Sequence, residues 1–211
     1  MSPLPERMAD HWWWRPGCRP GRRQYVWHIL FGDHAEVRRA VRDLQTRLAC
    51  LPGLDLVPEA WLHMTTHIVG FADEITDTEA KEIAAAASTR LRNINPVKVT
   101  FGRTLFHPEA VMLAARPRLS LMPIREAVCG AAAQVSGLEP AGCSDDWVPH
   151  VTAAYSNSEG LAQPVIHAAG KTLGDCEVTI AEVHLVAQER QGHLYRWEPV
   201  ATARLRGGAG P

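Results

Sequence analysis

The chain has 211 residues, 46% of them hydrophobic, which is enough to build one large domain around its own core. Its 22 basic and 23 acidic side chains give a formal charge of −1, so no overall positive field attracts duplex DNA. No apolar run reaches the roughly 18 residues that span a membrane, and the N-terminus lacks the order of a secretory signal. The five cysteines are odd in number and form no C-x-x-C pair, which predicts a reduced, cytoplasmic protein without membrane contact, metal or cofactor.

Residues 1–24 differ in composition from the rest of the chain. The stretch DHWWWRPGCRPGRRQ (10–24) combines three consecutive tryptophans, two Pro-Gly turns and four arginines. Terminal segments fray by default, but exposing three indoles would leave a large apolar patch, so we expect this N-terminal arm to pack back onto the body. Two functions stay open for Trp14 and Arg15. They form a hydrophobic clasp with solvated arginines, which we prefer slightly, or they stack on a base and pair with a phosphate.

The predicted elements alternate between strands and helices. Helices are predicted from their apolar spacing and end signals: 34–50 with Asp33 as N-cap, 76–94 behind a capping box of Thr76 and Glu79, 119–137 with its start near Pro123, and a short one in 159–170. Strands are predicted in runs of bulky residues: 24–31, 61–71, 96–106 with a break at Gly102, 109–115, 147–156, 177–188 and 193–205, the last two paired through 189–192. This alternation favours an α/β or α+β fold, in a single domain over 25–206 that is followed by a flexible tail at 207–211.

Two segments of the chain resemble each other, PEAWLHMTTHIVG (58–70) and SDDWVPHVTAAYS (144–156). In each, a tryptophan lies two or three residues before an H-x-T motif. Residues i and i+2 of a strand face the same side, so each motif points an imidazole and a hydroxyl into one space while its middle residue packs into the core. A single H-x-T is common by chance, and only the pair predicts a site. The two motifs are His63-Met64-Thr65 and His150-Val151-Thr152.

Two imidazoles and two hydroxyls suit phosphodiester chemistry without a metal ion. One neutral imidazole takes a proton from the attacking water or hydroxyl, and the other, protonated, gives one to the leaving oxygen. The hydroxyls of Thr65 and Thr152 hold the non-bridging phosphate oxygens. A metal ion between His63 and His67 is not expected, because on a strand their rings lie roughly 13 Å apart.

The paired motifs resemble the 2H phosphoesterase superfamily, which includes bacterial 2'-5' RNA ligase (LigT-like) proteins and cyclic nucleotide phosphodiesterases. The segment PHVTAAY is the most family-like, LHMTTHIVG is similar to the first motif, and the likeness extends from YVWHILF to HLYRWEPVA. The resemblance implies a bilobal α+β fold, with two pseudo-symmetric lobes of mostly antiparallel sheets flanked by helices around a central groove. It also implies hydrolysis of cyclic phosphodiesters, or formation and cleavage of 2'-5' linkages in RNA, without a metal.

Carried over residue by residue, the resemblance makes His63, Thr65, His150 and Thr152 catalytic, with His150 as the base and His63 as the acid. The family often has a basic residue or Leu after the first threonine, where this chain has Thr66. The N-terminal arm is not part of the family pattern, so the choice of substrate does not carry over.

Two further residues are candidates for substrate binding. His28 shares a strand face with Val26 and Leu30, and lies either at the edge of the core or in the groove. Tyr155 follows Thr152 by three residues and points away from it on a regular strand, which favours a core or rim position over stacking on a base. We expect a monomer whose partner is a small nucleotide or an RNA terminus. The alternatives are a groove that binds these ligands without chemistry, and an interaction protein that uses the tryptophan arm as an adhesive patch.

Overall fold

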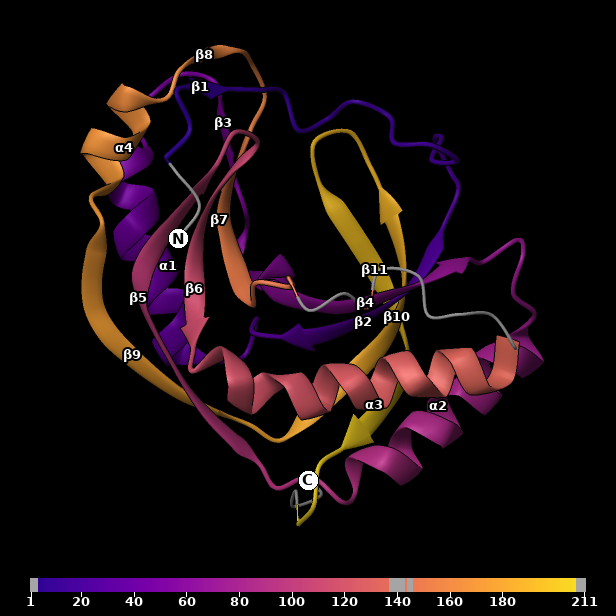
Figure 1. Ribbon diagram of the computed structural model, residues 1–211. Coiled ribbons are helices and arrows are strands. Elements are labelled where there is room, and N and C mark those ends of the chain that lie inside the picture. The colour runs from indigo at the N-terminus through magenta and orange to yellow at the C-terminus, as the bar shows by residue number, and fades with distance from the viewer. Residues whose placement is uncertain (1–3, 137–142, 144–145, 208–211) are drawn as a thin grey trace.

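The computed structural model describes residues 4–136, 143 and 146–207 (Figure 1). In this part of the chain, a four-stranded and a five-stranded antiparallel sheet form the body. The first has the order β11-β10-β2-β4, with β2 (Gln24–Leu30), β4 (His63–Phe71), β10 (Glu182–Arg190) and β11 (Tyr195–Arg204). The second has the order β3-β7-β6-β5-β9, with β3 (Leu54–Leu56), β5 (Val97–His107), β6 (Ala110–Arg116), β7 (His150–Ser156) and β9 (Thr172–Ile180). The predicted α+β class with mostly antiparallel sheets is confirmed.

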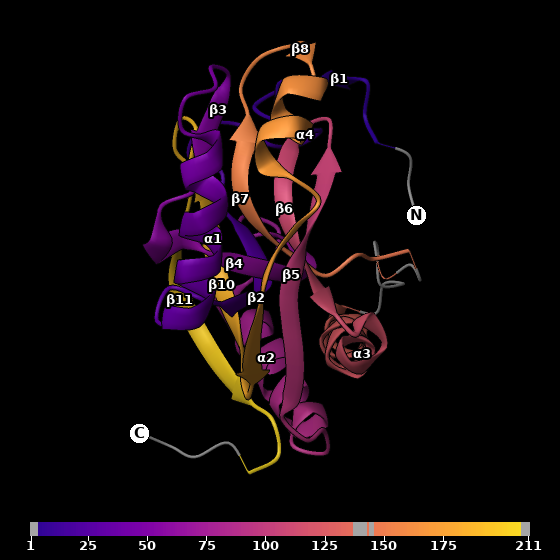
Figure 2. The ribbon, with the colours of Figure 1, turned by 90° about the vertical axis from the view of Figure 1, so that its left-hand side faces the viewer.

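The helices interlock the two sheets. They are α1 (Ala35–Leu48), α2 (Asp77–Leu91), α3 (Arg118–Ser136) and α4 (Gln163–Ala169), with a 3-10 turn η1 (Glu59–Trp61). Helix α1 follows a strand of the four-stranded sheet but packs on β7 and β9, with α4 beside it, whereas α3 follows β6 but packs on β4 and α2. In Figure 2, α3 is seen end-on, on the opposite side of β5 from α1. Helix α1 therefore covers the sheet that does not contain β2, and α3 covers the sheet that does not contain β6.

Local sequence predicts the start of α2 correctly and the starts of α1 and α3 incorrectly. Thr76 and Glu79 form the predicted capping box, in which each side chain accepts a hydrogen bond from the backbone N–H of the other residue. The prediction of Asp33 as N-cap is wrong, since His34 is the cap residue of α1. The predicted start of α3 is also wrong, because the helix begins at Arg118 with Pro123 inside it. A proline there removes one hydrogen bond to the carbonyl of Leu119, a residue that is itself 76% exposed.

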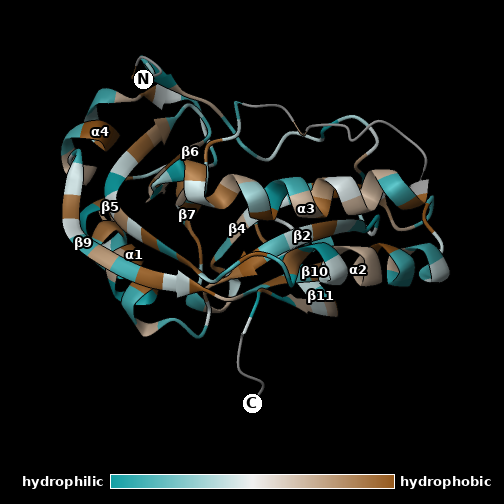
Figure 3. Cartoon of the chain, turned by 60° about the horizontal axis from the view of Figure 1, so that its bottom comes forward, coloured by the Kyte–Doolittle hydropathy of each residue, from teal (hydrophilic) through white to brown (hydrophobic). Residues whose placement is uncertain are grey.

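Two strands differ from their predictions. The run 177–188 is not one strand, since β9 ends at Ile180 in one sheet and β10 begins at Glu182 in the other. Strand β5 is not broken at Gly102 but bulged there, because its register shifts between Phe101 and Arg103. A Cβ at this glycine would meet the mobile carboxylate of Asp175 and lie 3.3 Å from the Asp175 Cα, so glycine eases the close approach of β9. The strands, including β5, carry long hydrophobic stretches that form the core between the layers (Figure 3).

The prediction of a fully reduced chain is wrong, because Cys129 of α3 is disulfide-bonded to Cys143. An odd number of cysteines excludes complete pairing but not a single bridge, and their separation in sequence gave no sign of it. Cys18, Cys50 and Cys176 carry free thiols. In the described part of the chain, no helix is long and apolar enough to cross a membrane.

The N-terminal arm packs onto the body, as expected from its tryptophans. Strand β1 (Arg7–Met8) pairs with β8 (Gly160–Leu161), and the backbone N–H of His11 donates to the carbonyl of Ser156 at 2.8 Å. Trp12 is only 4% exposed, and its indole N–H donates to Asp55. From there the arm runs across the top of the molecule to β2 (Figure 1).

Candidate active site

The two H-x-T motifs begin neighbouring strands. His63 is the first residue of β4 and His150 the first of β7, and Cα atoms of these strands approach within 8 Å of each other. The indole N–H of Trp147, three residues before the second motif, donates to the carbonyl of Thr65 in the first at 3.1 Å. This bond fixes the start of β7 against β4. The middle residues of both motifs are buried, as the strand alternation predicted.

The two motif histidines have the same orientation. The Nδ1 of His63 lies 2.8 Å from the carbonyl oxygen of Trp61, and the Nδ1 of His150 lies 2.7 Å from that of Val148. A carbonyl only accepts hydrogen bonds, so each Nδ1 carries the proton and donates it. In the neutral ring this leaves the Nε2 lone pair free to accept a proton.

The surroundings of these two histidines are unequal. The ring of His63 lies 4.3 Å from that of His28 and 4.9 Å from that of Trp197, between centroids. Burial lowers the pKa of His63 to about 4, against the opposing effect of its backbone hydrogen bond, and the charge of His150 lowers it further. Burial also lowers the pKa of His150, whose own backbone hydrogen bond is exposed. That His150 affects His63 electrostatically agrees with the close approach of their strands.

His28 does not reach the surface. It is completely buried behind His63, with its Nε2 at 2.7 Å from the side-chain oxygen of Gln188. Burial first, and then repulsion from His63, lowers its pKa well below the usual value, so this ring is neutral. A direct contact between His28 and a substrate is therefore excluded, and its contact is with the motif histidine.

Tyr155 faces the same side as Thr152, contrary to the prediction. The register of β7 against β6 shifts at this point, because Val111 pairs with Ala154 and Met112 with Thr152. The extra residue in β7 is a bulge, which reverses the alternation of the side chains after it. The hydroxyls of Tyr155 and Thr152 are hydrogen-bonded to each other, and burial raises the pKa of the phenol, so it stays protonated.

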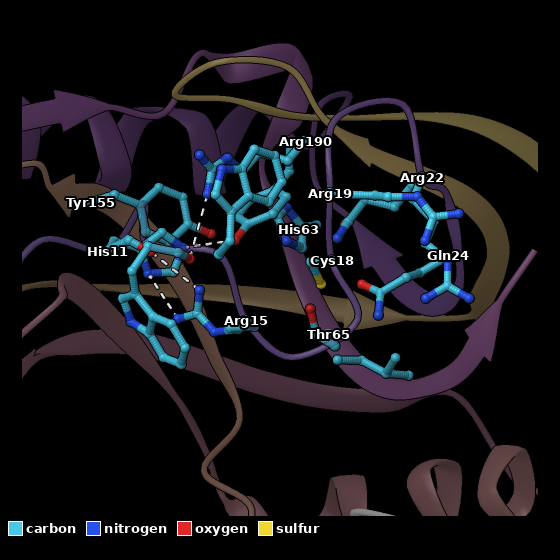
Figure 4. A pocket seen from close by; sticks show the side chains of 15 residues that line it. His11, Arg15, Cys18, Arg19, Arg22, Gln24, His63, Thr65, Tyr155 and Arg190 are labelled. Carbon is cyan, nitrogen blue, oxygen red and sulfur yellow. Dashed lines mark hydrogen bonds between the residues drawn. The ribbon is translucent and has the colours of Figure 1, made fainter.

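A pocket of about 210 Å³ opens beside the first motif (Figure 4). In the close-up, His63 and Thr65 lie between Tyr155, His11 and Arg15 on one side and Arg19, Arg22 and Gln24 on the other. Among the described residues, His150 and Thr152 do not line this pocket. Its walls are His11, Trp13, Trp14, Arg15, Cys18, Arg19, Arg22, Gln24, His63, Thr65, Ile68, Tyr155, Gln188, Arg190 and Tyr195.

Sequence reasoning found part of this lining and missed the rest. Trp14 and Arg15 were predicted as candidates for substrate binding, and both line the pocket. Arg19 and Arg22 also line the pocket, but they were not named as site residues. The arginine-rich composition of their segment could have indicated them. Arg190 and Gln188 enter from the end of β10, and no local pattern marks them.

In the described part of the chain, one cluster has ligands suited to a metal ion. The ligand atoms of His67, Cys129 and Cys143 lie within 4.8 Å of one another, and the Nδ1 of His67 is 3.6 Å from the Cys143 sulfur. The two sulfurs are bonded to each other, so neither is the thiolate that would bind a metal. His67 is buried, so it does not share the exposed side of β4 with the pocket.

Comparisons with known proteins agree with this architecture. The sequence matches the 2'-5' RNA ligase superfamily over residues 32–192. TT0787 of Thermus thermophilus is 19% identical, with a TM-score of 0.69 over 88% of this chain and 100% of its own. Apo LigT of E. coli is 17% identical, with a TM-score of 0.65 over 88% and 98%. These TM-scores show that the chain has the 2H phosphoesterase-like fold. Structures of LigT in complex with ATP, 3'-AMP and phosphate have a similar fold. No curated protein sequence matches the chain.

Proposed function

Because this chain belongs to the 2'-5' RNA ligase superfamily, we propose that it is a metal-independent phosphodiesterase of the 2H type. It opens 2',3'-cyclic phosphates on nucleotides or RNA ends with water as the nucleophile. When a ribose 5'-hydroxyl attacks in place of water and the P–O3' bond breaks, the same ring opening forms a 2'-5' linkage. The observation that carries this proposal is the shared orientation of the motif histidines, each with Nδ1 held by a carbonyl two residues earlier and Nε2 free. The LigT complex with 3'-AMP supports a nucleotide as the ligand.

In hydrolysis, water attacks the phosphorus in line with the bond to one ribose oxygen. The Nε2 of His63 accepts the proton of the water, the new P–O bond forms, the P–O bond to the ribose breaks, and the protonated Nε2 of His150 donates to the leaving oxygen. The ring of His63 lies against His28 and Trp197, and its pKa is lowered to about 4. It is therefore neutral at pH 7 and can act as the general base. The more exposed His150 gains its proton beside the bound phosphate. This assignment is the opposite of the one the family pattern suggested.

The two threonines hold the phosphate during the reaction. Thr65 and Thr152 each lie two residues after a motif histidine on the same strand, so their hydroxyls share its side. Hydroxyls placed this way donate to the non-bridging oxygens and stabilise the charge that grows there. The bond of Trp147 to the Thr65 carbonyl keeps both pairs in register.

Turnover of adenosine 2',3'-cyclic phosphate in EDTA tests the proposal. His63→Ala and His150→Ala should each lower kcat by a factor of about 10² to 10⁴, while His167→Ala, on the exposed side of α4, should keep the native rate. Circular dichroism checks that the variants fold. A near-native rate in either motif variant would overturn the mechanism. Nucleotide binding without turnover over a panel of cyclic phosphodiesters would support a binding module instead.

A 4-nitrophenyl phosphodiester distinguishes the acid from the base. Its leaving group departs without a proton, so losing the acid costs little on this substrate, whereas losing the base costs as much as before. We expect His150→Ala to recover most of its lost rate on the 4-nitrophenyl ester and His63→Ala to recover none. The reverse pattern would restore the roles suggested by the family.

A further inference from the structure

The N-terminal arm is fixed to the catalytic strands by His11. Its Nδ1 lies 3.1 Å from a carboxylate oxygen of Glu109 and its Nε2 lies 3.0 Å from the hydroxyl of Tyr195. Its ring stacks on Tyr155 with 4.1 Å between centroids, and Tyr155 is hydrogen-bonded to Thr152. The arm therefore has a defined position relative to a motif residue.

The far end of the arm is fixed as firmly. The guanidinium of Arg22 lies over the ring of Phe71 at 3.5 Å, pairs with Asp73 and Glu74, and donates to the carbonyl of Gly17. Between its two anchors the arm closes one side of the pocket that holds His63 (Figure 4). The arm lies outside residues 32–192, the part that matches the superfamily, so the family match does not account for this wall of the pocket.

The pocket is lined by four arginines, and its described walls hold no carboxylate. The arginines are Arg15, Arg19, Arg22 and Arg190. Carboxylates just outside the walls compensate part of this charge, since Glu109 pairs with Arg15, and Asp73 and Glu74 pair with Arg22. Arg19 has the most free hydrogen-bonding capacity, since its side chain is 65% exposed and its salt bridge to Asp73 is long, at 3.3 Å. Arg19 is therefore the arginine of the wall that has capacity to bind a second phosphate beside the one that reacts.

Two tryptophans at the pocket present open aromatic surface. The guanidinium of Arg190 lies 3.7 Å from the ring centre of Trp14, and that of Arg15 lies 4.8 Å from the ring centre of Trp13. Trp14 is still 42% exposed and Trp13 49% exposed. An indole that is held in place by an arginine and still exposes part of its ring offers a surface on which a nucleobase can stack.

The size of the pocket limits its ligand. Its 210 Å³ lies below the roughly 300–1,000 Å³ of pockets for drug-sized ligands. A pocket of this size encloses at most part of one nucleotide, so the rest of the ligand would lie at its open side, where Trp14 and Arg19 are exposed.

We propose that the arm forms a nucleotide subsite, in which Trp14 stacks on the base and Arg19 binds a second phosphate of the same nucleotide. The preferred substrate is then a compact terminal nucleotide that carries a 5'-phosphate as well as the reacting cyclic phosphate. This inference rests on the proposed phosphodiesterase function and names its substrate class.

The test compares adenosine 2',3'-cyclic phosphate with and without a 5'-phosphate. The native protein should favour the 5'-phosphorylated form in kcat/KM by about tenfold or more, the value of one charge-assisted contact. Arg19→Ala should remove this preference, because it should lower kcat/KM on the 5'-phosphorylated form by more than on the unphosphorylated form. Trp14→Ala should lower kcat/KM on both, and Arg39→Ala, an exposed arginine on α1, should change neither. Equal rates on the two substrates in the native protein, or an equal loss on both in Arg19→Ala, would overturn the subsite.

Failure of the proposed function is distinguishable from failure of the subsite. If no substrate is turned over, calorimetry compares the binding of adenosine 3',5'-bisphosphate with that of 3'-AMP. A preference for the bisphosphate that Arg19→Ala abolishes supports the subsite without catalysis. Equal affinities, or affinities that Trp14→Ala leaves unchanged, make the arm a structural clasp and overturn it.

Discussion

Replacing His67 should make the protein less sensitive to mild acid. This residue is 6% exposed, on the core side of β4. Burial, and then the charge of Arg125, lowers its pKa to about 4. In an unfolded chain the imidazole has a pKa of about 6.5. Between these two values the unfolded chain binds a proton that the folded chain does not bind.

The sign of the effect follows from this difference. The contribution of neutral His67 to stability is complete above pH 6.5 and is lost as the pH falls toward 4. Each pKa unit corresponds to about 1.4 kcal/mol, so the full interval is worth roughly 3 kcal/mol. Lowering the pH from 7.5 to 5.5 crosses about one unit of it, which costs on the order of 1 kcal/mol through this ring alone.

Urea unfolding at pH 7.5 and 5.5, followed by tryptophan fluorescence, measures this cost. His67→Gln and His67→Leu remove the titrating group and differ in polarity, so their stabilities at pH 7.5 should differ from each other. Both should lose about 1 kcal/mol less than the native protein on acidification. Contributions from His11 and His63, whose pKa values are also lowered to about 4, cancel in the comparison. An identical loss in the native protein and both variants would refute the reasoning.

Two other predictions concern the connection between the halves. Cys143→Ser opens a loop of 14 residues and should lower the free energy of unfolding in urea by about 3 kcal/mol. Cys50→Ser, at an exposed free thiol, is its control, and equal stabilities for Cys143→Ser and the native protein would contradict the bridge. Trp147→Phe keeps the ring but removes the donor to the Thr65 carbonyl. It should cost about 1 kcal/mol of stability and lower kcat about tenfold through misplacement of the motifs. An unchanged kcat on a cyclic nucleotide would show that this bond does not position them.

What the sequence predicted well is what short stretches of it determine. The H-x-T pairs, the capping box at Thr76 and the apolar stripe of α1 depend on spacings of a few residues, and they fold as those spacings require. The run 177–188 was misread because its β-prone character continues where the chain passes from one sheet to the other, a change that only packing decides. Tyr155 was misplaced for a related reason, since the bulge in β7 arises from pairing with β6. The disulfide and the lining by Arg190 join positions with no shared local pattern.

The unequal surroundings of two equivalent motifs are what makes the proposed chemistry workable. Two identical imidazoles in identical environments would share one proton affinity, so neither would be poised as a base while the other stays an acid. Here the repeat supplies the same tautomer twice, and the fold then breaks the symmetry, since His28 and Trp197 enclose only His63. Trp197 comes from β11, beyond the part that matches the superfamily. The arm, outside it at the other end, adds arginines to the pocket that His63 lines.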